Sequence, residues 1–204
     1  GTYLGALGIG MNTEVLKAKN LPEPKCWADL LDPKFRDEIM IADPNSSGTA
    51  YTALATIVQV FGDDKGFEVL KGLHRNISQY TKSGIGPINA LKLGETAVGI
   101  GFIHDMVTQK LAGAPIKAIA PCEGTGYETG SVSLIKGGKN AELGRKFVDF
   151  ALGVEASDGK QMPFQRNQFA HRLTFVLVVT KVGGQHIDGL VERDVDFALF
   201  AEGE

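Results

Sequence analysis

The segment Asn45 to Thr49 combines hydroxyl side chains with a predicted helix start. It follows a short apolar run, Ile39 to Ala42, that suits a buried strand, and apolar residues at helical spacing come after it. First-turn backbone N–H groups, the positive end of the helix dipole and three hydroxyls would converge there, which suits an oxyanion. Ordinary N-capping by a serine explains the same residues equally well.

A second polar segment, Tyr80 to Gly84, also lies just before a predicted helix, which Pro87 opens. Thr81 and Ser83 would add hydroxyls, and Lys82 would add a full positive charge. A lysine beside a turn that simply faces solvent is the alternative. Neither segment has the Gly-x-x-x-x-Gly-Lys-Ser/Thr spacing of a nucleotide-binding loop, so we do not expect ATP binding.

A third group consists of His104 and Asp105, after an apolar strand predicted at 96–102, and Glu128 in a glycine-rich segment. Ionised carboxylates only accept hydrogen bonds, and an imidazole can donate or accept, so the set suits the hydroxyls of a sugar. A solvated loop with a helix-capping aspartate is the alternative. A phosphosugar enzyme that uses His104 and Asp105 as acid and base is a competing hypothesis.

Patterns for catalysis or metal binding are weak. No Gly-x-Ser-x-Gly elbow occurs, and the four histidines are dispersed. We therefore assign no catalytic residue, no metal ligand and no cofactor. For Cys26 and Cys122 we favour two separate small thiols over a disulfide, because their distance along the chain says nothing about bridging geometry.

Composition excludes several classes of protein. The 204 residues are 43% hydrophobic and 22% charged with a net charge of -3, as in ordinary globular proteins. No basic stripe interleaved with aromatic residues indicates nucleic-acid binding. The opening run is apolar and rich in glycine but has no basic region before it, so we interpret it as a strand inside a domain rather than a signal peptide.

Strand and helix patterns alternate along most of the chain, which predicts an α/β fold with a mostly parallel sheet and helices on both faces. The predicted strands are 3–12, 39–42, 77–80, 96–102, 115–120 and 131–135. The predicted helices are 14–19 with Thr13 as cap, one after Thr49, 65–73, 88–93, one from His104, and 140–152 with Asn140 as cap.

Five segments together resemble the iron/phosphonate/sugar-phosphate branch of type II periplasmic solute-binding proteins. They are 3–8, 27–35 (Trp-Ala-Asp-Leu-Leu-Asp-Pro-Lys-Phe), 42–52 (Ala-Asp-Pro-Asn-Ser-Ser-Gly-Thr-Ala-Tyr-Thr), 79–84 and 94–100. The resemblance covers about Tyr3 to Leu152. It implies that 1–12 is a hinge strand, that 13–135 is the second lobe, and that 136–204 holds C-terminal helices and a return segment toward a first lobe absent here. After about Gly153 the chain departs from the family pattern.

The resemblance also implies a function. Ferric-iron binders of the family carry paired tyrosines where this chain has His104 and Asp105, which disfavours iron. The residues instead look like those of hexose-phosphate binders, which implies an extracytoplasmic, periplasmic receptor that captures a small anionic solute for the membrane permease of an ABC importer. A receptor for iron, phosphonate or polyamine, or a purely structural lobe, is the alternative. The expected ligand-binding residues are Ser46, Ser47, Gly48, Thr49, Thr81, Lys82, Ser83, His104, Asp105 and Glu128.

Overall fold

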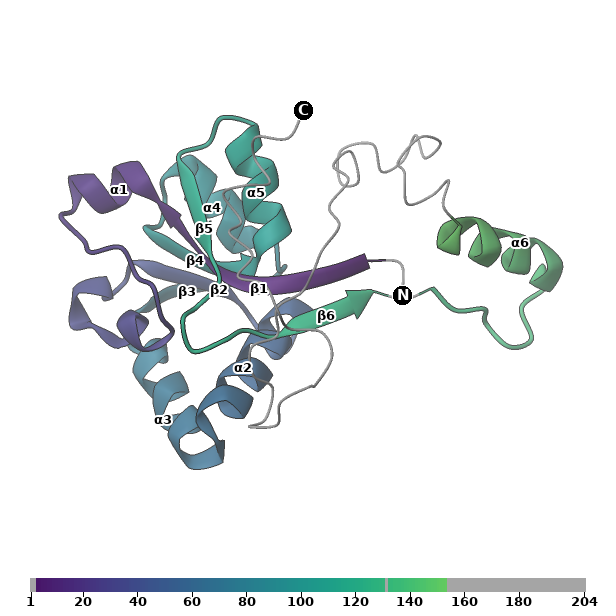
Figure 1. Ribbon diagram of the computed structural model, residues 1–204, viewed down its shortest axis with the longest axis horizontal. Coiled ribbons are helices and arrows are strands. Elements are labelled where there is room, and N and C mark those ends of the chain that lie inside the picture. The colour runs from purple at the N-terminus through teal and green to yellow at the C-terminus, as the bar shows by residue number, and fades with distance from the viewer. Residues whose placement is uncertain (1–2, 131, 154–204) are drawn as a thin grey trace. The chain divides into compact units, whose positions relative to one another are not determined.

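The computed structural model describes residues 3–130 and 132–153 and contains a six-stranded sheet (Figure 1). The strand order is β3-β2-β4-β1-β5, and β6 also pairs with β1. The strands are β1 (Tyr3–Asn12), β2 (Ile39–Ala42), β3 (Ile77–Thr81), β4 (Val98–Phe102), β5 (Ile116–Ile119) and β6 (Tyr127–Gly130). Since β2 is parallel to β3 and β4, and β1 is antiparallel to β4 and β5, strands β2 to β5 all run the same way. The expected mostly parallel sheet is confirmed.

Helices cover both faces of this sheet, as predicted, with α2 and α3 on one side and α4 and α5 on the other (Figure 1). The α-helices are α1 (Thr13–Ala18), α2 (Gly48–Phe61), α3 (Asp63–His74), α4 (Gly86–Leu93), α5 (Ile103–Leu111) and α6 (Ala141–Leu152). Two short 3-10 helices, η1 (Ala28–Leu31) and η2 (Pro33–Phe35), follow α1. Within the described ranges, no helix is both long and apolar enough to cross a membrane.

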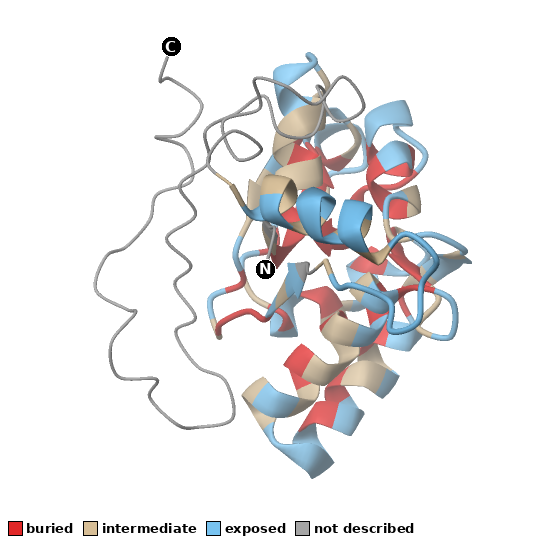
Figure 2. Ribbon diagram, turned by 90° about the vertical axis from the view of Figure 1, so that its right-hand side faces the viewer, coloured by how far each residue is buried: buried red, intermediate tan, exposed pale blue. Residues whose placement is uncertain are grey.

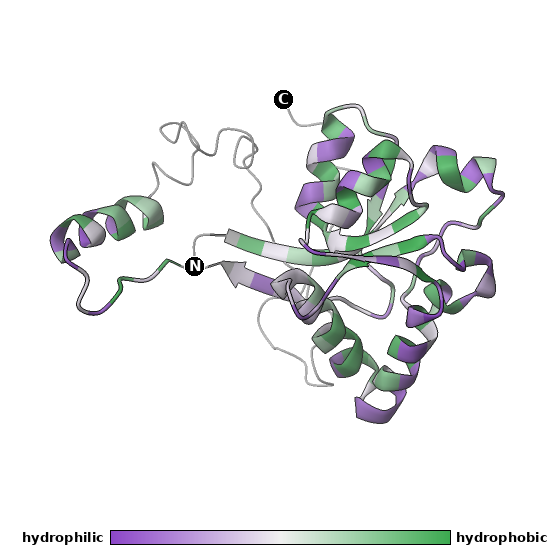
Figure 3. Ribbon diagram, turned by 180° about the vertical axis from the view of Figure 1, so that it is seen from behind, coloured by the Kyte–Doolittle hydropathy of each residue, from purple (hydrophilic) through white to green (hydrophobic). Residues whose placement is uncertain are grey.

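Strand β1 divides its two faces between large side chains and glycines. Leu7, Ile9 and Met11 are fully buried in the larger core cluster. Figure 3 shows stretches of hydrophobic colour along the strands of the sheet. On the other face, a Cβ on Gly10 would lie 2.7 Å from Leu91 of α4, and one on Gly8 would overlap a side chain of α5. The glycine-rich opening is therefore explained by the close approach of α4 and α5.

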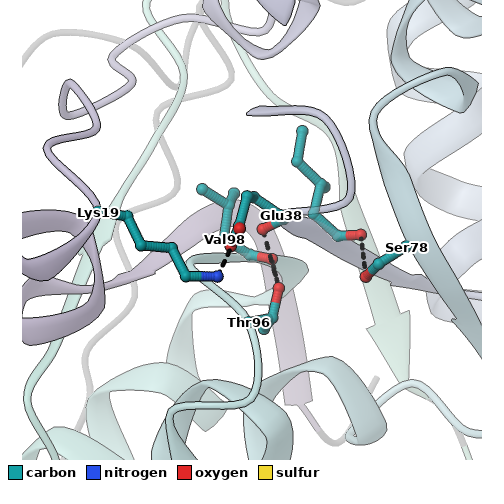
Figure 4. A network of polar contacts seen from close by, with 6 residues as sticks. Lys19, Glu38, Ser78, Thr96 and Val98 are labelled. Carbon is teal, nitrogen blue, oxygen red and sulfur yellow. Dashed lines mark hydrogen bonds and ion pairs between the residues drawn. The ribbon is translucent and has the colours of Figure 1, made fainter. Parts of the chain in front are cut away.

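Polar contacts hold the amino end of β2 between its two neighbours (Figure 4). The Glu38 carbonyl accepts hydrogen bonds from Thr96 Oγ1 and Val98 N, both 2.9 Å long, and Ser78 Oγ donates to the first carbonyl of β2 at 3.2 Å. Lys19 pairs with the Glu38 carboxylate. These bonds fix the register of three parallel strands, so their carboxyl ends reach the same edge.

A disulfide joins Cys26 to Cys122, with 4.7 Å between the two Cα atoms. The expectation of two separate thiols is wrong. The path after α1 brings Lys25 beside the exit of β5, where its carbonyl accepts a hydrogen bond from Cys122 N at 3.0 Å. This proximity comes from tertiary structure, so the spacing of the cysteines carries no sign of it.

Three local predictions also need correction. Asn12, rather than Thr13, caps α1. The strand predicted at 131–135 is β6 instead; 132–135 are not in a strand, and β6 can be polar because its side chains are mostly exposed. Helix α6 lies as predicted, but Asn140 makes no side-chain cap bond.

The described residues form two units. The larger is Ala6–Glu128 and contains the sheet core; the smaller has residues 3–5, 129–130 and 132–153. In the smaller unit α6 has no buried residue, and Leu143, Phe147 and Leu152 are exposed (Figure 2). The predicted return segment toward a first lobe lies outside the described residues.

The Asn12 cap provides a test of the corrected helix start. Its Oδ1 accepts hydrogen bonds from Glu14 N and Val15 N, both at 3.0 Å, and its Nδ2 donates to the Leu91 carbonyl at 2.7 Å. Asn12→Ala removes all three bonds from a buried site and should lower the free energy of unfolding by about 2 kcal/mol or more.

The matched control is Thr13→Ala, which removes an exposed 3.2 Å bond to the Pro115 carbonyl and should change stability by roughly 0.5 kcal/mol or less. Urea unfolding followed by fluorescence of Trp27, which is buried, measures both variants. A larger loss for Thr13→Ala than for Asn12→Ala would contradict this cap assignment.

Candidate functional site

Three helices begin at one edge of the sheet. Strands β2, β3 and β4 are parallel, and each is followed by a helix: α2, α4 and α5 respectively. The carboxyl ends of parallel strands meet at a common edge, where α/β proteins generally bind ligands. The three polar groups predicted from the sequence lie on or beside these helix starts. Glu128 is the one member that a strand, β6, carries.

The structure brings the first two polar segments into contact. Ser46 Oγ donates to the Lys82 carbonyl at 2.9 Å. A Cβ on Gly84 would lie 2.5 Å from Thr49 Oγ1 and 3.2 Å from Ser47 Oγ, so the backbone of one segment packs directly on the hydroxyls of the other. The starts of α2 and α4 therefore form one group of amides and hydroxyls.

Several of these hydroxyls also have local structural roles. Ser47 is the N-cap of α2 and accepts a long 3.4 Å bond from Ala50 N, as the capping alternative predicts. Thr81 Oγ1 donates to the Ser83 carbonyl at 2.9 Å. Lys82 is exposed, in agreement with the solvent-facing alternative.

His104 and Asp105 occupy the first turn of α5. His104 Nε2 lies 3.6 Å from Asp105 Oδ1, and the imidazole stacks on the Phe102 ring with 5.2 Å between centroids. The N-cap residue of α5 is Phe102, whose side chain makes no cap bond, and Asp105 follows it within the helix rather than at the N-cap position. The Asp105 carboxylate therefore does not serve as the N-cap of α5.

Burial sets the protonation of this pair. It lowers the pKa of His104, against the smaller opposing effect of the Asp105 charge, and it raises the pKa of Asp105, against the effect of His104. Their side chains are 29% and 21% exposed. A neutral imidazole can both donate and accept hydrogen bonds, which suits a hydroxyl group of a ligand.

Glu128 lies beside the start of α2. Its Oε2 is 3.8 Å from the place that a Cβ on Gly48 would occupy. Two residues before Glu128, Gly126 packs against Thr56 of α2, which holds this part of the chain close to the helix. Among the described residues, no hydrogen bond or ion pair links Glu128 to His104 or Asp105.

Sequence reasoning missed three features around this edge. Gly84 was predicted only as the end of the second polar segment, whereas it packs closely on Thr49 and Ser47. Glu123 accepts two backbone hydrogen bonds, from Trp27 N at 2.7 Å and Ala28 N at 2.9 Å. Glu123 also lies beside Cys26 and Cys122 in a cluster of ligand-type atoms, but these cysteines form the disulfide and offer no thiolate to a metal.

A family model and a solved structure that match this chain both belong to solute-binding proteins. The model of the family described as bacterial extracellular solute-binding protein matches residues 1–160. The periplasmic binding protein AfuA from Actinobacillus pleuropneumoniae, solved with exogenous fructose-6-phosphate bound, is 52% identical, with a TM-score of 0.75 over 82% of this chain and 52% of that one.

Two curated relatives extend the comparison. An uncharacterized protein of Haemophilus influenzae is 52% identical over 157 residues, 76% of this chain and 45% of its own length. A Salmonella typhimurium protein with the provisional name of a 2-aminoethylphosphonate-binding periplasmic protein is 26% identical over 152 residues, 71% of this chain and 44% of its own. The chain thus spans about half the length of these relatives.

The contact at Gly84 can be tested by adding one methyl group. Gly84→Ala forces apart the starts of α2 and α4 and should lower the free energy of unfolding by about 1–3 kcal/mol. Gly48→Ala is the matched control, because its Cβ would meet Glu128 only at an ordinary 3.8 Å. Equal effects of the two variants in urea unfolding would show that Gly84 is not closely packed.

The pKa of His104 can be measured by an NMR pH titration, with its signal assigned by its loss in His104→Gln. We expect a midpoint below the ordinary value of about 6.5. Because Asp105 raises this pKa, Asp105→Asn should lower the midpoint further. A midpoint above the ordinary value would mean that the Asp105 charge outweighs burial.

The same shift makes stability depend on pH. The folded protein binds the His104 proton less readily than the unfolded chain, so this contribution is complete above about pH 6.5 and is lost as the pH falls from there through the lowered pKa. His104→Gln should flatten the loss of stability in that range, as measured by urea unfolding at a series of pH values.

Proposed function

The chain belongs to the bacterial extracellular solute-binding proteins, and on that premise we propose that it is part of a periplasmic receptor that delivers a small anionic solute to an ABC importer. The matched family and the AfuA structure are solute-binding proteins rather than enzymes, so the phosphosugar enzyme is not our choice. The proposed partner is the membrane permease, which would recognise the solute-loaded receptor. In that receptor, 1–12 would act as a hinge strand and 13–135 as the second lobe.

We favour a sugar phosphate as the solute. The observation that carries this proposal is the meeting of two chemistries at one sheet edge: amides and hydroxyls at the contacting starts of α2 and α4, and the acidic and imidazole groups of α5 and β6. The first suits a phosphate and the second suits sugar hydroxyls. The sugar phosphate bound to the 52% identical AfuA structure supports the same choice.

Each side of the site has a proposed role. Ser46, Ser47 and Thr49, with the amide of Gly48, hold the phosphate, and the Thr81 to Ser83 segment contributes from the facing helix start. His104, Asp105 and Glu128 accept or exchange hydrogen bonds with hydroxyls. No metal or other cofactor takes part in this scheme.

The position of Glu128 favours a phosphate ester over free phosphate. Its carboxylate lies next to the first turn of α2, where it would repel a bare phosphate. A sugar hydroxyl placed between the two groups would donate to Glu128 and separate the charges. The site would therefore select a ligand that carries both groups.

The strongest rival is a phosphonate receptor, which the Salmonella relative supports. A phosphonate would use the helix starts and leave His104 and Asp105 without hydroxyl partners. A polyamine is disfavoured because helix starts repel cations. Ferric iron is disfavoured because the paired tyrosines are replaced by His104 and Asp105.

The test is a titration of the 204-residue chain followed by NMR of backbone amides, which detects weak binding. Glucose 6-phosphate and fructose 6-phosphate should shift the amides of residues 47–50 and 128 saturably. Free glucose and inorganic phosphate should bind more weakly. Saturable binding of 2-aminoethylphosphonate without binding of either sugar phosphate would overturn the proposed solute.

A substitution at Glu128 separates the two sides of the site. Glu128→Gln removes a charged acceptor, so binding of glucose 6-phosphate should weaken by roughly 10-fold or more, while inorganic phosphate should bind at least as well as before. Glu68→Gln, an exposed carboxylate on α3, is the matched control and should change neither. Equal weakening for both ligands would contradict the hydroxyl role of Glu128.

A further inference from the structure

We propose that a group of four residues, Cys26, Trp27, Cys122 and Glu123, positions Glu128 for recognition of the solute hydroxyls. We call this group the clasp. Two of its residues belong to the segment after α1, and the other two belong to the loop from β5 to β6. This inference rests on the proposed function, and it adds positioning residues that do not themselves touch the solute.

The clasp joins its two segments by covalent and polar bonds. Besides the disulfide, both Glu123 carboxylate oxygens accept backbone hydrogen bonds, from Trp27 N at 2.7 Å and Ala28 N at 2.9 Å. Trp27 is 1% exposed, and its Nε1 donates to the Gly124 carbonyl at 3.0 Å. The loop is thus held at three consecutive residues.

A short, bonded path leads from the clasp to Glu128. Thr125 Oγ1 donates to the Leu7 carbonyl at 2.9 Å, and Leu7 N donates to the Gly126 carbonyl at 3.0 Å. Gly126 packs tightly on Thr56 of α2. Residues 122 to 126 thus each make a bond or a close contact, and in this proposal they pass a shift at the clasp on to the strand that carries Glu128.

The phosphate side of the site is held by other bonds. Ser46 Oγ and the Lys82 carbonyl join the two helix starts, and Asp43 N donates to the Thr81 carbonyl at 2.7 Å. None of these bonds involves the clasp. Release of the clasp should therefore weaken hydroxyl recognition and leave phosphate recognition unchanged, whereas a general loss of stability would affect both.

The disulfide can be opened without mutation because Cys122 is exposed. Dithiothreitol supplies two electrons and two protons, the S–S bond becomes two thiols, and the reagent is oxidised to its cyclic disulfide. Glu123→Gln weakens the clasp by a second route, since an amide NH₂ would face a backbone N–H where a carboxylate oxygen accepts.

The experiment compares the 204-residue chain in four forms: oxidised, reduced, Glu123→Gln, and Cys26→Ser with Cys122→Ser. Glu68→Gln is the charge control. Binding of glucose 6-phosphate and of inorganic phosphate is measured by NMR titration, and amide hydrogen exchange is measured for residues 122–129. We expect sugar-phosphate binding to weaken roughly 2- to 30-fold in the three altered forms, while the affinity for inorganic phosphate changes less than about twofold. Amide hydrogen exchange should become faster in residues 122–129 than it does in α2.

The outcomes separate the two proposals. If the oxidised chain binds no sugar phosphate, the proposed function fails. Amide exchange then tests the clasp separately: exchange at 127–129 that is the same in all four forms would refute it. If the oxidised chain binds and the altered forms bind equally well, or lose both ligands in parallel, the clasp does not position Glu128. Should the double cysteine variant not fold, reduction and Glu123→Gln decide the question.

Discussion

Parallel pairing of β2 with both β3 and β4 determines where everything else in the larger unit can lie. It brings three strand ends to one edge. Polar side chains fix the opposite end of β2: Thr96 donates to the Glu38 carbonyl just before β2, Ser78 donates to the first carbonyl of β2, and Lys19 pairs with Glu38. With the strands in that register, α2 and α4 must begin side by side. Only a residue without a side chain fits between them, and Gly84 is that residue.

Groups that attract an anion and groups that repel one lie at the same edge of the sheet. Amides and hydroxyls at the helix starts attract an anion, while Glu128 and the half-buried Asp105 repel one. Under the proposed function, a site with both features would hold a bare phosphate poorly and a phosphate ester with hydroxyls well, because hydroxyl hydrogens would lie between the like charges. Discrimination in that proposal would come from an unfavourable contact with the wrong ligand as much as from favourable contacts with the right one.

Much of this could be predicted from local sequence. Helical spacing after Thr49, Pro87 in the first turn of α4, and the apolar runs of β2 and β4 indicated the elements. The three polar groups, apart from Glu128, were expected at helix starts for that reason. The ligand-binding roles of those residues stay predictions. What local sequence does not contain is the pairing of distant segments: the disulfide, the hydrogen bonds of Glu123 and the packing of Gly84 on Thr49 each depend on tertiary structure. The polar β6 was missed because it pairs with β1 without burying apolar side chains.

The position of β1 also constrains how the chain acquires its structure. Met11 pairs with Val98 on one side and with Lys117 on the other, so β1 precedes both of its main neighbours by most of the length of the unit. During synthesis on a ribosome, this strand leaves the exit tunnel long before either neighbour does. It cannot pair with β4 before about residue 102 has emerged, or with β5 before about residue 119, and contacts this distant along the chain form slowly. An exported protein with this topology gains time in which it remains unfolded enough to be translocated.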